Sequence, residues 1–291
     1  MKLALGTVQF GLNYGVTNTQ GQVLQSEVNS ILDLAKQANI KLLDTASAYG
    51  ESESALGKYS GLVDFNLVTK IPKMEQESRT IAQIAKQSLS KVHHQPLHAI
   101  LFHDANDLLS PNADYFFSQV QKLKNDGICK KIGVSVYTLE QMFAITERYP
   151  IELIQIPFNC FDQRFAERAC QNIYKRYNIE VHARSLFLQG TLLCKQYDLP
   201  SYFTQFKPAY DNFHELCEAL NCQPMTLALA IPQQLEFIDH AILGVCSALQ
   251  LKQILQSYSA SQQLVKLSTE QLKKLQFEDL RLINPANWSI E

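Results

Sequence analysis

Eight short apolar segments recur along the chain, and a longer segment with helical periodicity follows each of them. In these longer segments apolar residues return every three or four positions, as Val28, Ile31 and Leu32 do. Strands that alternate with helices in this way favour a parallel sheet. Eight such units are typical of a closed (β/α)₈ barrel, whereas an open doubly wound sheet more often has about five or six strands. The predicted strands are residues 2–6, 41–44, 66–70, 98–102, 131–135, 153–156, 179–183 and 241–244, and the predicted helices are residues 26–38, 52–59, 80–92, 112–125, 139–147, 165–177, a pair near 211–234, and 249–257.

The length of the chain agrees with this architecture, because 291 residues suit one barrel of roughly 250 residues with a few additions. No linker composition divides the chain, so residues 1–291 are predicted to form a single domain. A long connection, residues 185–208, follows the seventh predicted strand, and long connections in compact domains are usually functional or disordered. The tail is predicted to hold a helix at 270–280 and then an irregular end, 281–291, that contains the only tryptophan, Trp288.

The amino-acid composition argues against several classes of protein. The chain has 26 basic and 28 acidic residues without a basic stripe, which argues against nucleic-acid binding. It has no apolar run of about 18 residues and no signal-peptide pattern at its start, so we expect no membrane span and a cytoplasmic location. Its seven cysteines are odd in number and include no C-x-x-C pair, which predicts reduced thiols, with no disulfide framework and no metal site.

Polar side chains gather where the predicted strands end. In a (β/α)₈ barrel the carboxyl ends of the strands face the active site. Asp44, Lys70 and His103 end or directly follow three consecutive strands, so we expect them to be neighbours, with Tyr49 in the loop after Asp44. Further polar residues at later strand ends are Ser135, Gln155 and Arg184.

This set has the chemistry of a proton donor. A free tyrosine has a pKa near 10, and a nearby ammonium group is expected to lower the pKa of Tyr49. Asp44 would pair with Lys70 and hold it charged, while His103 would donate a hydrogen bond to a substrate carbonyl oxygen. A hydride would have to come from a cofactor, because no side chain supplies one.

Each residue alone has a simpler explanation. Tyr49 could be a surface tyrosine, Lys70 an exposed charge and His103 a hydrogen-bonded structural histidine, and Asp44 could cap a turn. Their joint occurrence at three consecutive strand ends favours a functional site.

Seven segments together resemble the aldo-keto reductase family. LLDTASAYGESESALGKY is similar to the family's D-T-A-x-x-Y-G and E-x-x-x-G signature. LVTKI and LFHD resemble the strands that bear its lysine and histidine, and GTVQFG resembles its first strand and cofactor loop. KKIGVSVY, IQIPFN and ARSLFLQGTLL are similar to three later family segments, so that the resemblance runs roughly from Leu3 to Leu255.

The resemblance implies reduction of an aldehyde or ketone by a nicotinamide cofactor on a (β/α)₈ barrel. Tyr49 would be the general acid, tuned by Lys70 and Asp44, and His103 would orient the substrate. NADPH is the expected cofactor and NADH the alternative, because AILGVCSALQLKQIL resembles the segment that grips the 2′-phosphate but offers only Lys252 nearby. The implied cofactor-binding residues are Thr7 and Asp44 at the nicotinamide riboside, Ser135 and Gln155 at the carboxamide, Arg184 beside the nicotinamide, Ser185, Leu186 and Gly190 along the pyrophosphate, and Gly244 and Gln250 at the adenosine end.

The chain also departs from the family pattern. Val136 replaces the usual asparagine beside the carboxamide, Arg184 stands where many members have a stacking aromatic, and Leu186–Phe187 replaces Pro-Leu. A guanidinium plane can stack, but its charge is unfavourable beside an oxidised nicotinamide.

Two other functions fit parts of the pattern. A Schiff-base lyase on the same barrel would use Lys70 as its nucleophile, and a redox sensor would bind the cofactor with little turnover. The partner in the main interpretation is a small carbonyl substrate. The sequence gives no indication of the oligomeric state. Loops after the first, fourth and seventh strands and the C-terminal tail are expected to line the substrate pocket, with Tyr14, Phe102, Tyr137, Phe158, Phe187 and Trp288 as candidates.

Overall fold

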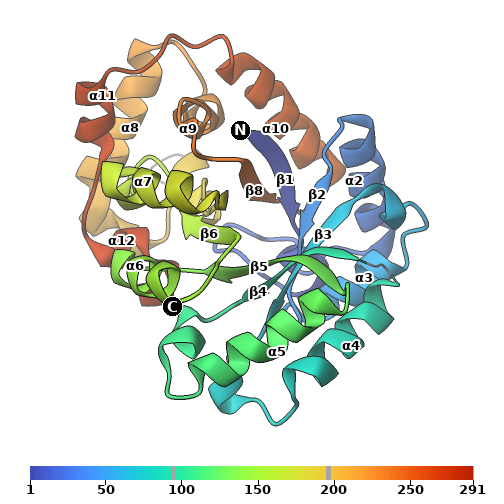
Figure 1. Ribbon diagram of the computed structural model, residues 1–291. Coiled ribbons are helices and arrows are strands. Elements are labelled where there is room, and N and C mark those ends of the chain that lie inside the picture. The colour runs from blue at the N-terminus through green and yellow to red at the C-terminus, as the bar shows by residue number, and fades with distance from the viewer. Residues whose placement is uncertain (94–95, 195–197, 291) are drawn as a thin grey trace.

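A computed structural model describes residues 1–93, 96–194 and 198–290. Eight parallel strands follow one another around a closed barrel, and β8 pairs with β1 to complete the ring. The predicted (β/α)₈ barrel is therefore confirmed (Figure 1). The strands are β1 (Lys2–Gly6), β2 (Leu42–Asp44), β3 (Asn66–Ile71), β4 (Leu97–Phe102), β5 (Cys129–Ser135), β6 (Leu153–Pro157), β7 (Glu180–Arg184) and β8 (His240–Gly244).

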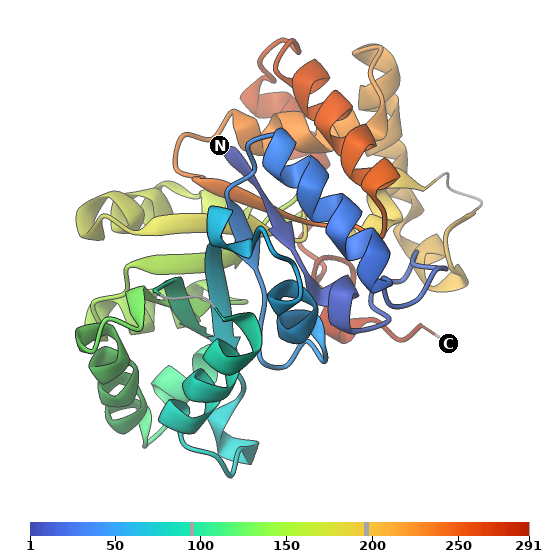
Figure 2. The ribbon, with the colours of Figure 1, turned by 90° about the vertical axis from the view of Figure 1, so that its right-hand side faces the viewer.

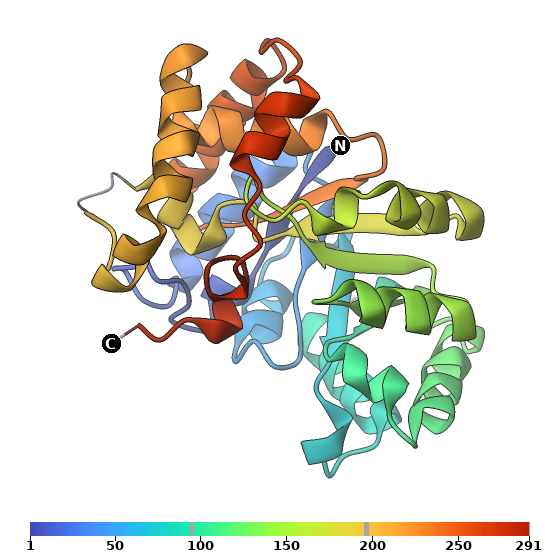
Figure 3. The same cartoon turned by 90° about the vertical axis from the view of Figure 1, so that its left-hand side faces the viewer.

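Helices surround the barrel. Figure 2 shows α2 and α10 side by side across the seam where β1 meets β8, and Figure 3 shows the chain after α10 descending beside α8. The helices are α1 (Val8–Gly11), α2 (Gln25–Gln37), α3 (Ser52–Gly57), α4 (Ile81–Val92), α5 (Ala113–Asn125), α6 (Leu139–Arg148), α7 (Arg168–Tyr177), α8 (Lys207–Ala219), α9 (Pro224–Gln233), α10 (Ala248–Ser261), α11 (Thr269–Leu275) and α12 (Leu280–Ile283).

The strands bury both of their faces. A small inner cluster of apolar side chains fills the barrel, and a much larger outer cluster packs the strands against the helices. Successive residues of a strand point to opposite faces. Because Leu42 and Val68 belong to the inner cluster, the same register carries Asp44 and Lys70, two residues further on, to the inside of the barrel's C-terminal mouth.

The predicted tail helix is wrong in its extent. The segment 270–280 divides into α11, which begins at a Ser268 capping box, and α12, which Asp279 caps by accepting from the N–H of Arg281. Between them Phe277 donates its N–H to the carbonyl of Phe161 at 3.0 Å. This tertiary hydrogen bond holds the chain extended, and a capping aspartate then starts a new helix. The predicted irregular end therefore begins within a helical turn, and residue 291 lies outside the described residues.

A second helix begins later than expected. The predicted helix 165–177 starts at Arg168, and Phe165 lies in a preceding 3₁₀ turn, Arg164–Ala166. The short helix α1, directly after β1, was not predicted.

All seven cysteines are free, as the odd count and the spacing predicted. Among the described residues no helix combines the length and apolar character needed to cross a membrane.

Candidate active site

A cavity of about 630 Å³ opens at the C-terminal mouth of the barrel. It brings together predicted site residues from the carboxyl ends of the strands and the loops that follow them, and among the predicted catalytic and cofactor-binding residues Lys70 alone does not line it. The predicted residues that line the cavity are Thr7, Asp44, Tyr49, His103, Ser135, Gln155, Arg184, Ser185, Leu186, Gly190, Gly244 and Gln250.

Lys70 lies directly behind this wall. Its side chain is fully buried, and its ammonium group lies 2.5 Å from a carboxylate oxygen of Asp44. It also donates to the carbonyl of Thr45 at 3.0 Å and approaches the hydroxyl of Tyr49 at 3.3 Å. Lys70 therefore influences the cavity only through its contacts with Tyr49 and Asp44, which do line it.

The turn that carries Tyr49 is held from two sides. A side chain at Gly11 would place its Cβ 1.9 Å from the carbonyl of Tyr49, so only glycine lets α1 pack this closely against the turn. On the other side the buried hydroxyl of Ser52 bonds to the hydroxyl of Thr7 at 2.7 Å and to that of Thr45 at 3.0 Å. These contacts fix the position of the Tyr49 ring relative to Lys70.

The protonation of Tyr49 differs from the expectation. Lys70 does favour the phenolate, but burial of the hydroxyl outweighs it and the pKa of Tyr49 is raised above its usual value of 10. Burial alone would lower the pKa of Lys70, yet Asp44 and Tyr49 together raise it. The pair is therefore a neutral phenol beside a charged ammonium group at neutral pH.

His103 lies edge-on to the Tyr49 ring, with ring centroids 5.6 Å apart and an interplanar angle of 82°. Burial, followed by the positive charge of Lys70, lowers the pKa of His103 to about 4. A neutral imidazole and a neutral phenol thus face the same part of the cavity, and each carries a proton that it can share with an oxygen atom.

A chain of hydrogen bonds links this group to the later strands. Gln155 donates its amide to the second carboxylate oxygen of Asp44 at 2.8 Å and accepts from the Ser135 hydroxyl at 3.4 Å. Arg184 reaches the same hydroxyl at 3.4 Å. The residues assigned to proton delivery and those assigned to the cofactor carboxamide therefore form one network.

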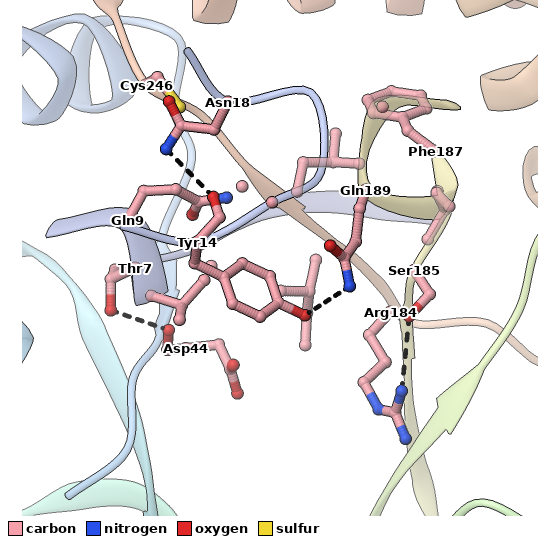
Figure 4. A pocket seen from close by; sticks show the side chains of 18 of the residues that line it. Thr7, Gln9, Tyr14, Asn18, Asp44, Arg184, Ser185, Phe187, Gln189 and Cys246 are labelled. Atoms are coloured by element: carbon pink, nitrogen blue, oxygen red, sulfur yellow. Dashed lines mark hydrogen bonds between the residues drawn. The ribbon is translucent and has the colours of Figure 1, made fainter. Parts of the chain in front are cut away.

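Arg184 is oriented by its surroundings. Its guanidinium donates to the carbonyl of Val136 at 3.1 Å and lies 4.2 Å from the centroid of the Tyr137 ring. Figure 4 shows it on the wall of the cavity beside Ser185, to which it is hydrogen-bonded. The side chain that replaces the family's aromatic residue thus itself stacks on an aromatic ring.

Two loops meet over the cavity. The loop after β1 donates the N–H of Val16 to the side chain of Gln189 at 3.1 Å and the hydroxyl of Thr17 to the Gln189 carbonyl at 2.9 Å. Gly190 has φ +92°, and a Cβ there would lie 2.1 Å from the Thr17 hydroxyl. Gly190 therefore serves the contact between the loops as well as lining the cavity. Tyr14 and Gln189, which are hydrogen-bonded, face each other in the same view (Figure 4).

Several polar residues of the cavity were not among the predicted site residues. Gln9, Asn18 and Gln189 all line it, and the side-chain oxygen of Gln9 is buried without a hydrogen-bond partner. The position of Gln9, two residues after the predicted site residue Thr7 in the segment GTVQFG, was the signal that could have indicated it.

The predicted substrate pocket is right only in part. Tyr14, Tyr137 and Phe187 line the cavity. Phe102 and Phe158 are fully buried in the outer core, because their positions in the strand register turn them toward the helices. Trp288 packs edge-on against Phe203 at 4.9 Å, and within the described part of the chain no tail residue reaches the cavity.

The adenosine end of the predicted site lies between β8 and α10. Gln250 lines the cavity there, but its side-chain oxygen accepts from the N–H of Cys246 at 2.7 Å. Lys252 is exposed on α10 and is not among the lining residues that the structure describes.

Comparison with known proteins agrees with this geometry. The model of the aldo/keto reductase family matches residues 2–276. A curated aldo-keto reductase from Mycolicibacterium smegmatis is 28% identical over 130 residues, which cover 43% of this chain and 45% of that protein, so the match spans less than half of the relative.

Solved structures show the same fold. An aldo-keto reductase from Bacillus halodurans in its holo form has a TM-score of 0.71 at 19% identity, covering 99% of this chain and 94% of the other. A glycerol dehydrogenase from Gluconobacter oxydans has a TM-score of 0.69 at 23% identity, covering 97% and 92%. With the family match over nearly the whole chain and a barrel that carries the predicted residues at its C-terminal mouth, the chain belongs to the aldo/keto reductase family.

Proposed function

We propose that this protein reduces an aldehyde or ketone to an alcohol with a nicotinamide cofactor, and that Tyr49 donates the proton. The observation that carries the proposal is the contact of the Tyr49 hydroxyl with a buried ammonium group, Lys70, at the wall of a large cavity. The neutral His103 faces the same space. The family match over residues 2–276 supports the reaction class.

The cavity fits a dinucleotide. It extends from Tyr49 past Ser135 and Arg184 to Gly190 and the start of α10, and its volume of about 630 Å³ is within the range of cofactor sites. The unpartnered buried oxygen of Gln9 offers an acceptor for a ligand hydroxyl or amide. When bound, a reduced nicotinamide supplies the hydride that no side chain can provide.

The residues of the chain handle the proton and the developing negative charge. Tyr49 transfers its phenolic proton to the carbonyl oxygen, and the adjacent Lys70 ammonium stabilises the phenolate that remains. Asp44 holds Lys70 charged and in place. His103, neutral at the pH of catalysis, donates a second hydrogen bond to the same oxygen and sets its direction.

The charge and burial of Lys70 argue against a Schiff-base lyase. A nucleophilic amine must be neutral and must reach the substrate. Lys70 is 1% exposed, and its pKa is raised by its pairing with Asp44 and Tyr49. The other alternative, a sensor that binds the cofactor, would have the same site, so only a measurement of turnover separates it from an enzyme.

The test is turnover on a panel of aldehydes and ketones with NADPH and with NADH, followed by the loss of nicotinamide absorbance. We expect reduction of at least one carbonyl class. Tight cofactor binding without turnover on any member would support the sensor instead. Because no lysine or arginine lines the described cavity near Gln250, we expect NADH to support turnover within about tenfold of NADPH.

A further inference from the structure

The opposite end of the barrel holds a second cluster of ionisable side chains. Glu180 and His182 lie on β7, two residues apart, and His182 is paired in register with His240 of β8. His98 of β4 reaches them across the barrel interior, because β5 and β6 lie between β4 and β7 in the closed ring. These side chains line the N-terminal mouth of the barrel, away from the cavity described above.

One carboxylate stands at the centre of this cluster. The Nε2 atom of His98 lies 2.9 Å from one oxygen of Glu180, and Nε2 of His182 lies 2.8 Å from the other. Nδ1 of His240 lies 3.4 Å from the oxygen that His182 contacts. The ammonium group of Lys131 lies 2.5 Å from the oxygen that His98 contacts.

The carboxylate does not satisfy all of these groups. Nδ1 of His240 is buried and lies 3.4 Å from Glu180, but it is not aligned for a hydrogen bond, so this contact is only a weak ion pair. Buried polar atoms in folded proteins nearly always have partners, so an unpartnered nitrogen that faces a carboxylate calls for an explanation. A cation held by His98, His182 and the carboxylate would lie beside this nitrogen and give it a stronger partner.

We propose that His98, Glu180 and His182 form a binding site for a divalent transition metal ion, best suited to Zn²⁺, with His240 next to its fourth coordination position. One ligand atom from each of the first three residues lies within 4.8 Å of the others. Ligands about 2.0–2.1 Å from a tetrahedral zinc ion lie roughly 3.3 Å apart. The distances of 2.9 and 2.8 Å from Glu180 to His98 and His182 require only small side-chain adjustments to reach that spacing. His240, 3.4 Å from Glu180, lies outside this group of three and must move to become a fourth ligand.

The donor set determines the choice of metal. Imidazole nitrogen suits Zn²⁺, Cu²⁺ and Ni²⁺, whereas Mg²⁺ and Ca²⁺ prefer a shell of oxygen atoms. Two imidazoles and one carboxylate are a ligand set that zinc accepts in tetrahedral coordination, and the fourth position is open to water or to His240.

Lys131 is the competitor for this site. Its ammonium group occupies one carboxylate oxygen, so a metal ion must displace it. The side chain of Lys131 is 34% exposed and has a flexible four-carbon stem, which lets it turn out into solvent. Its position predicts that removal of the ammonium group strengthens metal binding.

The site would be structural rather than catalytic. Glu180 and Arg184 are the first and last residues of β7, so about 13 Å of strand separates the cluster from the cavity. The ligands come from β4 and β7, with His240 of β8 beside them, and a bound ion would join strands on opposite sides of the barrel. The inference therefore does not depend on the proposed reductase activity.

The test is calorimetric titration of protein without a histidine tag with zinc chloride, after treatment with a chelator. We expect one equivalent to bind, His182→Gln and Glu180→Gln to lose at least about tenfold in affinity, and Lys131→Met to bind more tightly than the wild type. His93→Asn is the matched control, since His93 lies outside the cluster and its left-handed conformation suits asparagine. Equal zinc binding by the wild type and His182→Gln, or none by the wild type, would overturn the proposal.

A second measurement needs only the wild-type protein and so is independent of how the variants fold. Cobalt(II) added in place of zinc should give the intense visible absorption of a tetrahedral site, and zinc should abolish it. A weak spectrum like that of the hydrated ion would contradict the proposal. It would show that the cluster only closes the N-terminal mouth of the barrel through hydrogen bonds.

Discussion

The two mouths of the barrel each hold a lysine 2.5 Å from a carboxylate, but the pairs differ in their surroundings. At the C-terminal mouth Lys70 and Asp44 have side-chain exposures of 0% and 4%. At the N-terminal mouth Lys131 and Glu180 are 34% and 11% exposed. The loops after the strands cover the first pair and leave the second open to solvent.

The neighbours of each pair decide what it can do. Lys70 touches a phenol that has a proton to give, and Tyr49 borders a large cavity. Lys131 shares its carboxylate with three imidazoles, whose ring nitrogens are common metal ligands, and no phenol lies among these partners. By our two proposals, the same pair of residue types therefore supports proton transfer at one mouth and cation binding at the other.

Replacing Tyr49 with phenylalanine tests the C-terminal mouth most directly. Loss of the general acid should lower kcat by roughly 10²- to 10⁴-fold while cofactor affinity stays near that of the wild type. Steady-state kinetics and fluorescence titration of the cofactor measure the two effects. Tyr115→Phe, at an exposed tyrosine of α5, is the control. Turnover near the wild-type value would disprove the role of Tyr49 as proton donor.

The same substitution at each lysine compares how much the two ion pairs contribute to the free energy of unfolding. Lys70→Met leaves Asp44 buried without its cation and should cost about 3–5 kcal/mol in the free energy of unfolding. Lys131→Met should cost no more than about 1 kcal/mol, because that pair is partly solvated and Glu180 keeps its histidine contacts. Urea denaturation in the presence of a chelator gives both values. Equal costs would mean that burial does not distinguish the two pairs.

His103 should make the C-terminal mouth sensitive to acid. Its pKa is about 4 in the folded protein and 6.5 for an ordinary histidine, so the unfolded chain binds more protons between these values. Stability should therefore fall as pH decreases from about 6.5 to 4, and His103→Gln should lose less over that interval. Asp107, whose pKa is raised to about 6, also makes stability depend on pH, but its contribution is the same in the wild type and in His103→Gln and so cancels in the difference. Parallel stability curves from urea denaturation would contradict this assignment.

The smallest expected effect concerns the adenosine end of the cavity. Gln250→Arg places a cation where the described lining has none, and should shift the ratio of NADPH to NADH affinity by about tenfold toward NADPH. Gln250→Met is the control, because it removes the hydrogen bond to Cys246 without adding charge. An unchanged ratio in the arginine variant would place the 2′-phosphate elsewhere.

Much of the candidate site at the C-terminal mouth could be predicted from the sequence because its residues follow a local rule. Asp44 and Lys70 each end a predicted strand, Tyr49 and His103 follow strand ends, and the barrel places such positions at one mouth. The protonation of Tyr49 could not be predicted in this way, because it depends on how deeply the surrounding loops bury the hydroxyl.

The direction in which single side chains point also could not be predicted without the structure. Phe102 and His103 are adjacent, yet the first is buried among the outer helices and the second faces the cavity. Trp288 packs on Phe203 because the tail turns at the hydrogen bond between Phe277 and Phe161, a contact over more than one hundred positions in the chain.

The sequence by itself determined the alternation of strands and helices, the family, and most of the candidate polar residues of the C-terminal mouth, since each depends on a short contiguous segment. Only the tertiary structure decided the cluster at the other mouth. His98, Glu180 and His240 lie far apart in the chain and match no spacing rule, and they meet because eight strands close into a ring. Local periodicity specifies which face of a strand a side chain occupies, but closure of the barrel determines which side chains that face meets.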